Sequence, residues 1–126
     1  KGIVNELDTE KSIKLGLDGI IISNHGGRQL DPGLSSIDAL RNIYPKFKNK
    51  ITIMMDSGIK SGPDIARSIA CGAQFTFLGR SFMYGVGALG KSGGDHTIEI
   101  LNTQLNQIME QLSCENILDL KNHLIY

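Results

Sequence analysis

Three short runs of apolar residues, each followed by a polar loop that contains glycine, limit the folds open to this chain. They cover residues 19–23, 51–55 and 75–78. Each run is continuous rather than alternating, which is typical of a strand buried on both faces. We therefore expect three buried strands.

Segments with helical periodicity and start signals separate these runs. We expect helices that end near residues 15, 44 and 72, and a longer helix over residues 97–112 whose apolar face runs from Ile98 to Leu112. The alternation of helices and strands favours an α/β fold with a parallel sheet built from right-handed βαβ units. A doubly wound sheet and part of a (β/α)8 barrel both fit this order. The expected capping residues are Asp8 or Thr9, Ser35 or Ser36, and Ser61.

Composition and charge exclude several classes of protein. The chain has 126 residues, which suits about one domain. The 13 Lys and Arg residues balance 13 Asp and Glu residues, which argues against a protein that binds nucleic acid through a basic surface. Two cysteines make no disulfide framework, and no His, Cys and carboxylate cluster has the spacing of a metal site. The sequence opens at Lys1 without a methionine, so we expect a fragment of a longer protein.

The loops after the three runs carry the residues with the clearest chemistry. The carboxyl ends of parallel strands meet at one edge of a sheet or one mouth of a barrel, where ligands bind. His25 follows the first run and is a candidate general base, because an imidazole titrates near neutral pH. Arg28 offers a planar fork that suits a carboxylate. The alternative is a loop histidine and a surface arginine in a glycine turn.

Cations and glycines after the second and third runs predict an anion site. Gly58, Lys60, Gly79 and Arg80 look like the phosphate cradle of the last two loops of a barrel. In such a cradle, backbone N–H groups, a helix N-terminus and a cation share one anion. The alternative is a set of ordinary loop glycines with exposed basic residues. Asp56, at the end of the second run, either binds a ligand hydroxyl or caps the turn.

One glycine motif is not expected to bind a dinucleotide. Residues 85–90 satisfy the pattern G-x-G-x-x-G. A dinucleotide site also needs a strand directly before the motif and an acidic residue ~20 positions further on, after a second strand. Residues 80–84 separate this motif from the third run, and the sequence after it is helical.

The chain resembles the FMN-dependent α-hydroxy acid dehydrogenases and oxidases over essentially its whole length. Residues 23–29, Ser-Asn-His-Gly-Gly-Arg-Gln, are similar to the active-site signature of that family. The block over residues 56–80, with its Asp-Ser-Gly start, is most similar to the bacterial quinone-linked L-lactate dehydrogenases. The resemblance implies that residues 1–126 form the C-terminal half of a (β/α)8 TIM barrel, from the end of strand 5 through helix 8, with the N-terminal half absent.

The resemblance also implies a role for each site residue. His25 is the base that removes the substrate's proton, and Arg28 holds the substrate carboxylate. Lys1 faces N1 and O2 of the flavin, where a cation stabilises the anionic reduced form. Lys60 stands where many relatives carry Arg, so a point charge replaces the fork at the phosphate. The remaining cofactor-binding residues are Ser23 at the flavin ring, Asp56 at the ribityl chain or neighbouring backbone with Ser57 beside it, and Gly58, Lys60, Gly79 and Arg80 at the phosphate.

For the complete enzyme, the resemblance implies oxidation of a small L-2-hydroxy acid, L-lactate to pyruvate. The alternatives are a glycolate- or mandelate-type oxidase and a non-catalytic half-barrel that binds phosphate ligands. The electron acceptor would be a quinone, a cytochrome or oxygen, and the complete enzyme a homo-oligomer. The default location is the cytoplasm, with the inner face of the bacterial plasma membrane as the alternative by analogy. The half-barrel alone is expected to be inactive.

Overall fold

The computed structural model describes residues 1–124, which fall into two compact units. The first unit comprises Lys1–Gly58 and Cys71–Phe77, and it contains the sheet. The second comprises Ile59–Ala70 and the chain from Leu78 onward, and it is helical.

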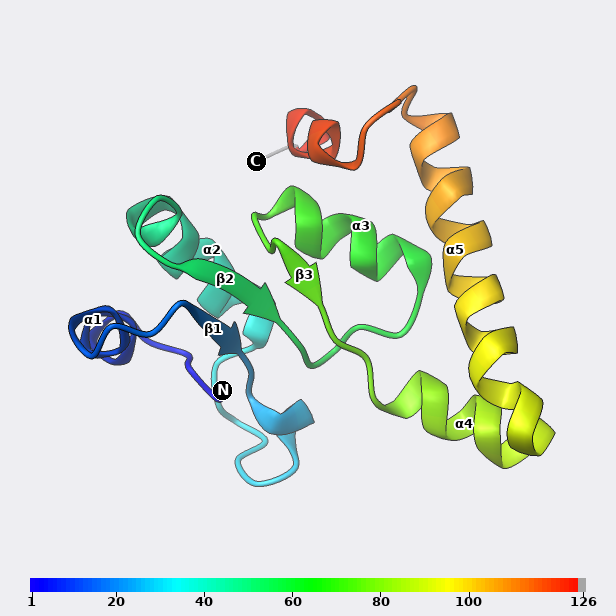
Figure 1. Ribbon diagram of the computed structural model, residues 1–126, viewed down its shortest axis with the longest axis horizontal. Coiled ribbons are helices and arrows are strands. Elements are labelled where there is room, and N and C mark those ends of the chain that lie inside the picture. The colour runs from blue at the N-terminus through cyan, green and yellow to red at the C-terminus, as the bar shows by residue number, and fades with distance from the viewer. Residues whose placement is uncertain (125–126) are drawn as a thin grey trace. The chain divides into compact units, whose positions relative to one another are not determined.

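The first unit is built on a parallel sheet of three strands in the order β1-β2-β3 (Figure 1). The strands are β1 (Gly19–Ile22), β2 (Thr52–Met55) and β3 (Phe75–Thr76). The register pairs Ile20 with Ile53 and Met54 with Phe75. The parallel sheet expected from the sequence is therefore confirmed, although β3 is shorter than its apolar run.

Burial alternates along the strands, so the expectation that both faces are buried was wrong. Ile20 and Ile22 of β1 are buried, whereas Ile21 between them is only half-buried. In β3, Phe75 is 58% exposed and forms an edge-to-face contact with Phe77. The helix α2 (Ser36–Phe47) packs against β1 and β2 and supplies a helix layer to the sheet. A continuous apolar run thus occurs here in a sheet that is covered well on one face only.

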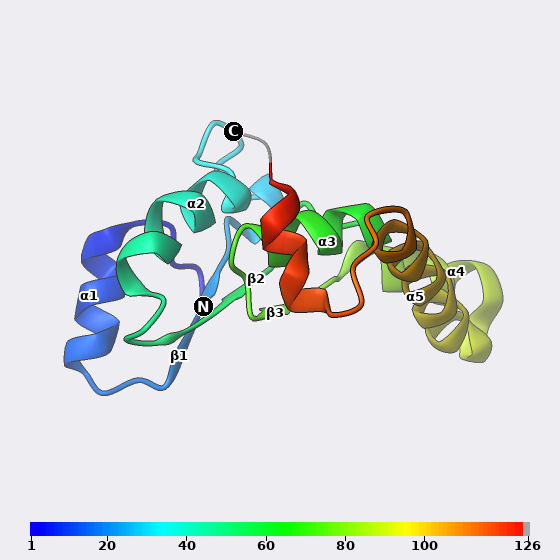
Figure 2. The same cartoon turned by 90° about the horizontal axis from the view of Figure 1, so that it is seen from above.

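The two helices of the first unit, α1 (Glu6–Lys14) and α2, lie side by side (Figure 2). Asn5 caps α1 by accepting a hydrogen bond from the backbone N–H of Asp8 at 2.9 Å, so Asp8 and Thr9 lie inside the helix rather than at its cap. Ser35 caps α2 as expected. This helix continues past residue 44 through Pro45 to the buried Phe47, because burial of that aromatic ring outweighs the hydrogen bond lost at proline.

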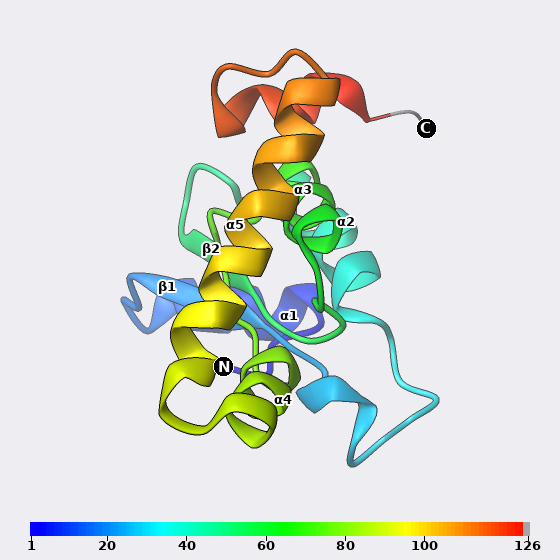
Figure 3. The same cartoon turned by 90° about the vertical axis from the view of Figure 1, so that its right-hand side faces the viewer.

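Up to residue 124, the second unit contains three α-helices and two 3₁₀ helices. They are α3 (Gly62–Ala70), α4 (Arg80–Leu89), η2 (Gly90–Ser92), α5 (Gly93–Gln111) and η3 (Ile117–His123). Figure 3 shows α4 beside the N-terminal part of α5. Ala66, Cys114 and Leu120 form a buried cluster against which Leu105 and Ile108 of α5 pack. The long helix thus begins at residue 93 rather than 97, and Ile98 is 49% exposed instead of lying on its buried face.

The glycine motif at residues 85–90 lies in α4 and at the start of η2, so the prediction that it does not directly follow a strand is confirmed. Gly85 lies inside α4, and a Cβ there would overlap Thr97 Oγ1 and stand 2.6 Å from the carbonyl oxygen of Gly93. Glycine is required because α4 and α5 cross at this point.

Residues 1–124 contain no helix that is both long and apolar enough to cross a membrane. Within the same range, no three His, Cys, Asp or Glu side chains gather as a metal site.

Candidate active site

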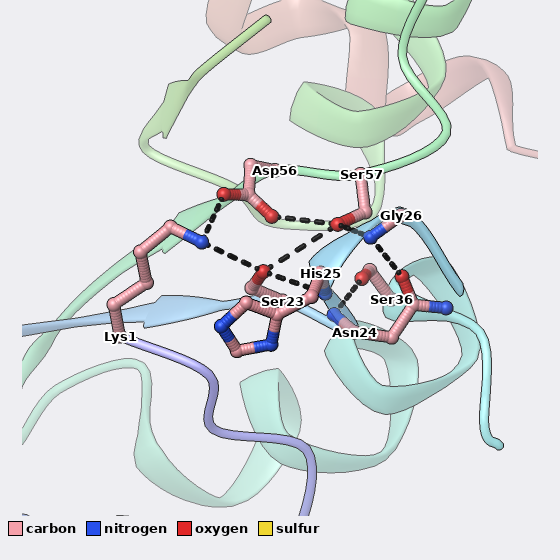
Figure 4. A network of polar contacts seen from close by, with 8 residues as sticks. All are labelled: Lys1, Ser23, Asn24, His25, Gly26, Ser36, Asp56 and Ser57. Carbon is pink, nitrogen blue, oxygen red and sulfur yellow. Dashed lines mark hydrogen bonds and ion pairs between the residues drawn. The ribbon is translucent and has the colours of Figure 1, made fainter. Parts of the chain in front are cut away.

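The N-terminal segment and the loops after β1 and β2 meet at one polar network in the first unit (Figure 4). Ile3 forms a parallel bridge with Ile22, which aligns the segment with β1. Lys1 Nζ then lies 2.8 Å from Asp56 Oδ2 and 3.1 Å from Ser23 Oγ. Three residues that the sequence analysis assigned to the cofactor are thus brought together.

Asp56 is ionised at the centre of this network. Partial burial alone raises the pKa of its carboxyl, but hydrogen bonds from Lys1, Ser23 and Ser57 and the charge of Lys1 outweigh burial, so the pKa lies below the ordinary value of 3.8. The Lys1 side chain remains 48% exposed, whereas that of Asp56 is 17% exposed. An ammonium group has three N–H donors, so one remains for a ligand after the contacts to Asp56 and Ser23.

His25 begins a tight 3₁₀ turn, η1 (His25–Gly27), directly after β1. Its φ is +57°, a left-handed conformation that is uncommon outside glycine, and Gly26 follows at +70°. Side chains hold the backbone of the turn, because the His25 N–H donates to Ser23 Oγ at 3.1 Å and the Gly26 N–H to Asn24 Oδ1 at 3.0 Å. The turn is therefore anchored at successive amides.

The imidazole of His25 is exposed and makes no hydrogen bond to any residue in the range 1–124. In Figure 4 the dashed contact to His25 ends on its backbone nitrogen, and none ends on the ring. Both ring nitrogens are consequently available to a substrate and to an orienting partner.

Arg28 is the residue that ends this turn, three positions after His25. Its guanidinium is exposed and, like the imidazole, forms no hydrogen bond or ion pair with the described residues. The turn thus carries a free base and a free cation on one short stretch of backbone.

The second unit contains Lys60, Gly79 and Arg80 of the residues expected at the phosphate. Its two loops differ in whether their backbone N–H groups are free to bind a ligand. The backbone N–H groups of Lys60 and Ser61 both donate to Asp64 Oδ2 at 3.1 Å, and the Gly62 N–H donates to Gln104 Oε1 at 2.8 Å. The start of α3 is therefore satisfied internally, which differs from the expected cradle of free amides. Burial raises the pKa of the Asp64 carboxyl, but hydrogen bonds from the Ser61 hydroxyl and from the Lys60 and Ser61 N–H groups, with the charge of Arg67, bring that pKa below the ordinary value.

The start of α4 is open by comparison. Gly79 is its N-cap residue and provides no side-chain hydrogen bond, and both Gly79 and Arg80 are exposed. Ser81 Oγ donates to the Lys60 carbonyl at 3.1 Å and so joins the two loops. Free amides, Arg80 and the exposed Lys60 are a donor set that fits a phosphate. Gly58, in the first unit, adopts φ +79°, which explains glycine at that position.

Sequence reasoning missed the residues that support the site. Ser36 Oγ accepts a hydrogen bond from the Asn24 N–H at 3.0 Å and thereby fixes the loop before His25. Asp64, inside α3, accepts hydrogen bonds from the Lys60 and Ser61 N–H groups before the helix, and Ser61, the expected capping residue, donates its hydroxyl to that carboxylate. The Ser61-x-x-Asp64 spacing is a signal that could have identified Asp64. Gln104 lies 42 positions from its partner, and no local pattern reveals such a contact.

The parallel α/β fold, with polar loops at its strand ends, matches the class of FMN-dependent TIM-barrel enzymes. The chain belongs to the FMN-dependent dehydrogenase family, whose profile matches residues 1–126. It is 44% identical over 120 residues to an L-lactate dehydrogenase of Actinobacillus pleuropneumoniae serotype 5b (strain L20), with 95% of this chain and 32% of the relative covered.

The chain is also similar to a second curated protein and to a solved structure. The 2-hydroxyacid oxidase 2 of Rattus norvegicus is 38% identical over 125 residues, which covers 99% of this chain and 35% of the oxidase. A mandelate oxidase variant solved with a monooxide FMN adduct superposes with a TM-score of 0.89 at 32% identity, over 95% of this chain and 38% of that structure. The chain thus spans about a third of the length of the curated relatives it matches.

FMN is the cofactor of this family, and the residues present fit it in chemical type. The first unit offers the Lys1 ammonium group beside Ser23, which suits the electron-rich edge of a flavin ring. The second unit offers the open start of α4 with Arg80, which suits the phosphate.

Proposed function

We propose that this chain is the C-terminal half of a TIM barrel in an FMN-dependent oxidoreductase that converts L-lactate to pyruvate. The observation that carries the proposal is the η1 turn. It holds His25 by its backbone, leaves the imidazole free, and places Arg28 three residues further on. Such a turn at the carboxyl end of a strand is where barrel enzymes carry catalytic groups.

In this function His25 acts as a general base. Neutral imidazole accepts a proton from the substrate, while Arg28 holds the substrate carboxylate through two of its N–H donors. Bound FMN supplies a two-electron acceptor, so that the hydroxy acid leaves as a 2-oxo acid. Proton removal by a positioned base contributes about 10²–10⁴-fold to rate.

Lys1 and Asp56 are assigned to the flavin rather than to the substrate. The Lys1 ammonium group would stabilise negative charge on the reduced flavin, and Asp56 fixes that ammonium group through a 2.8 Å ion pair. Ser23 accepts hydrogen bonds from Lys1 and from the His25 N–H, so it links the cofactor side to the base.

The phosphate of FMN is assigned to the start of α4. The open amides at Gly79 and Arg80, together with the side chains of Arg80 and Lys60, provide dipole and charge complementary to an anion. The amides at the start of α3 do not take part, because Asp64 and Gln104 already occupy them.

L-Lactate is favoured as the substrate by the 44% identity to an L-lactate dehydrogenase. A glycolate- or mandelate-type oxidase is the second candidate, supported by the rat 2-hydroxyacid oxidase 2 and the mandelate oxidase. A non-catalytic phosphate-binding half-barrel is the third. We place the complete enzyme in the cytoplasm or at the inner face of the bacterial plasma membrane, as a homo-oligomer that passes electrons to a quinone, a cytochrome or oxygen.

Anaerobic bleaching of the flavin tests the proposal. The complete protein, with the N-terminal half of the barrel in place, is mixed with L-lactate, glycolate or mandelate, and flavin absorbance is followed. Fast bleaching by L-lactate alone supports the proposal, and bleaching only by another hydroxy acid assigns a sister enzyme. If the bound flavin is reduced by none of these hydroxy acids, the third candidate, a non-catalytic binding protein, is favoured.

A further inference from the structure

We propose that Ser57 is a positioning residue that holds the His25 turn in register with the Lys1–Asp56 ion pair. Its hydroxyl joins the loop after β2 to the loop after β1, and in this role it acts on the backbone of the turn rather than on the flavin. The inference rests on the proposed function, because it assigns His25 the role of base.

The hydroxyl of Ser57 lies between the Asp56 carboxylate and the backbone of the His25 turn. The hydroxyl donates to Asp56 Oδ1 at 2.7 Å and accepts from the Gly26 N–H at 3.0 Å, and it lies 3.4 Å from Ser23 Oγ (Figure 4). A serine hydroxyl has one proton and two lone pairs. Ser23 accepts from Lys1 and from the His25 N–H, which leaves its own proton to point toward Ser57 or Asp56. The proton of Ser57 is therefore committed to Asp56, and one of its lone pairs is committed to the Gly26 N–H.

Backbone conformation supports the same assignment. Ser57 has φ +75° and His25 has φ +57°, two of the three non-glycine residues with positive φ within residues 1–124. A glycine would adopt this conformation at position 57 without strain, so a serine there costs stability. The hydroxyl contacts offset that cost, and they are made to the residue next to the candidate base.

The network predicts what loss of the hydroxyl would do. The Gly26 N–H keeps its bond to Asn24 Oδ1 at 3.0 Å, so the turn stays folded. It loses the bond that fixes it to the loop after β2, and the imidazole is then placed less accurately over the substrate. Accurate placement of a base acts on the chemical step rather than on substrate affinity.

Ser57→Gly is the decisive variant, because it removes the hydroxyl and the φ strain together. Ser113→Gly is the matched control, since Ser113 also has positive φ, +55°, but lies in the second unit outside the network. In the complete protein we expect Ser57→Gly to retain FMN and thermal stability and to lose on the order of 10-fold in kcat with KM nearly unchanged. Ser113→Gly should leave both kinetic constants as they are.

Hydrogen exchange gives a second readout that does not depend on turnover. Exchange of the backbone amides over residues 24–27 should accelerate in Ser57→Gly and stay at the parent rate in Ser113→Gly. Unchanged exchange and unchanged kcat would overturn the inference, and loss of FMN would show that Ser57 binds the cofactor instead. If none of the hydroxy acids reduces the flavin bound to the parent protein, the proposed function fails. The exchange rates still decide whether Ser57 holds the turn.

Discussion

The imidazole of His25 lies against the backbone of Gly2, where a Cβ would stand 3.1 Å from Cε1 of the ring. Gly2 adopts φ +88°, and its N–H donates to the Ile21 carbonyl at 3.1 Å. The N-terminal segment thus gives the candidate base a flat backbone surface, and a side chain at this position would displace the ring.

Gly2→Ala should therefore impair the base. We expect about 1 kcal/mol of lost stability from the positive φ, and a lower kcat because the imidazole moves. Gly16→Ala is the control, since Gly16 has φ +75° and nothing within 4 Å of its would-be Cβ. Thermal melts and steady-state kinetics on both variants separate the effects. Equal kcat values for the two variants would show that contact with Gly2 does not place His25.

The Asp56 carboxylate should make the protein more sensitive to acid. Its pKa in the folded state lies below the ordinary value of 3.8, so its contribution to stability is complete above that value and is lost as the pH falls through the folded pKa. Denaturant unfolding of the parent and of Asp56→Asn at several pH values measures this. The difference in free energy of unfolding should be constant near neutral pH and shrink below pH 3.8. If the difference in free energy of unfolding instead grew as the pH fell, the Asp56 pKa would be raised rather than lowered in the folded state.

The crossing of α4 and α5 predicts opposite effects for two glycines of one helix. Gly85→Ala should destabilise by about 1–3 kcal/mol, because the added methyl overlaps Thr97 Oγ1. Gly87→Ala should stabilise by about 0.5–1 kcal/mol, because its Cβ meets nothing within 4 Å and alanine favours a helix. Chemical denaturation of each variant gives the two values. A stabilising Gly85→Ala would refute the close approach of the two helices.

The assignment of the phosphate to the start of α4 predicts a change in cofactor affinity. Arg80→Ala should weaken FMN binding by about 10-fold or more, since a charged hydrogen bond contributes about 1.5–3 kcal/mol. Lys60→Arg should bind FMN at least as tightly, because a guanidinium restores the fork. Lys91→Ala, which removes an exposed cation from η2 in the same unit, is the control. Flavin titration of the apoprotein measures all three, and equal affinities for the parent and Arg80→Ala would refute the assignment.

Local patterns predicted the strands and part of the site. The Ile-rich runs identified β1 and β2 within one residue, and their parallel order placed His25 and Asp56 at the same edge of the sheet. The resemblance assigned Lys1 and Ser23 to one cofactor, and the structure brings their side chains within 3.1 Å. Periodicity and strand order suffice for the strands and for the edge at which their loops lie, whereas the pairing of Lys1 with Ser23 was implied by the resemblance alone.

Long-range contacts explain what the sequence did not reveal. Gln104 accepts a hydrogen bond from an amide of α3 although it lies on another helix, and Ser57, whose φ is positive, accepts one from Gly26 in a different loop. Such contacts arise from tertiary packing, and the secondary-structure propensities of neighbouring residues carry no information about them.

In the proposed function His25 removes the substrate's proton, and the rate of flavin reduction without the imidazole tests this role directly. The complete protein and its His25→Ala variant are prepared with bound FMN, and reduction of the flavin by L-lactate is followed anaerobically in a stopped-flow instrument. We expect the variant to keep its flavin spectrum and its flavin to be reduced about 10²–10⁴-fold more slowly than that of the parent. Reduction at the parent rate by a variant that holds FMN would contradict the role of His25 as the base.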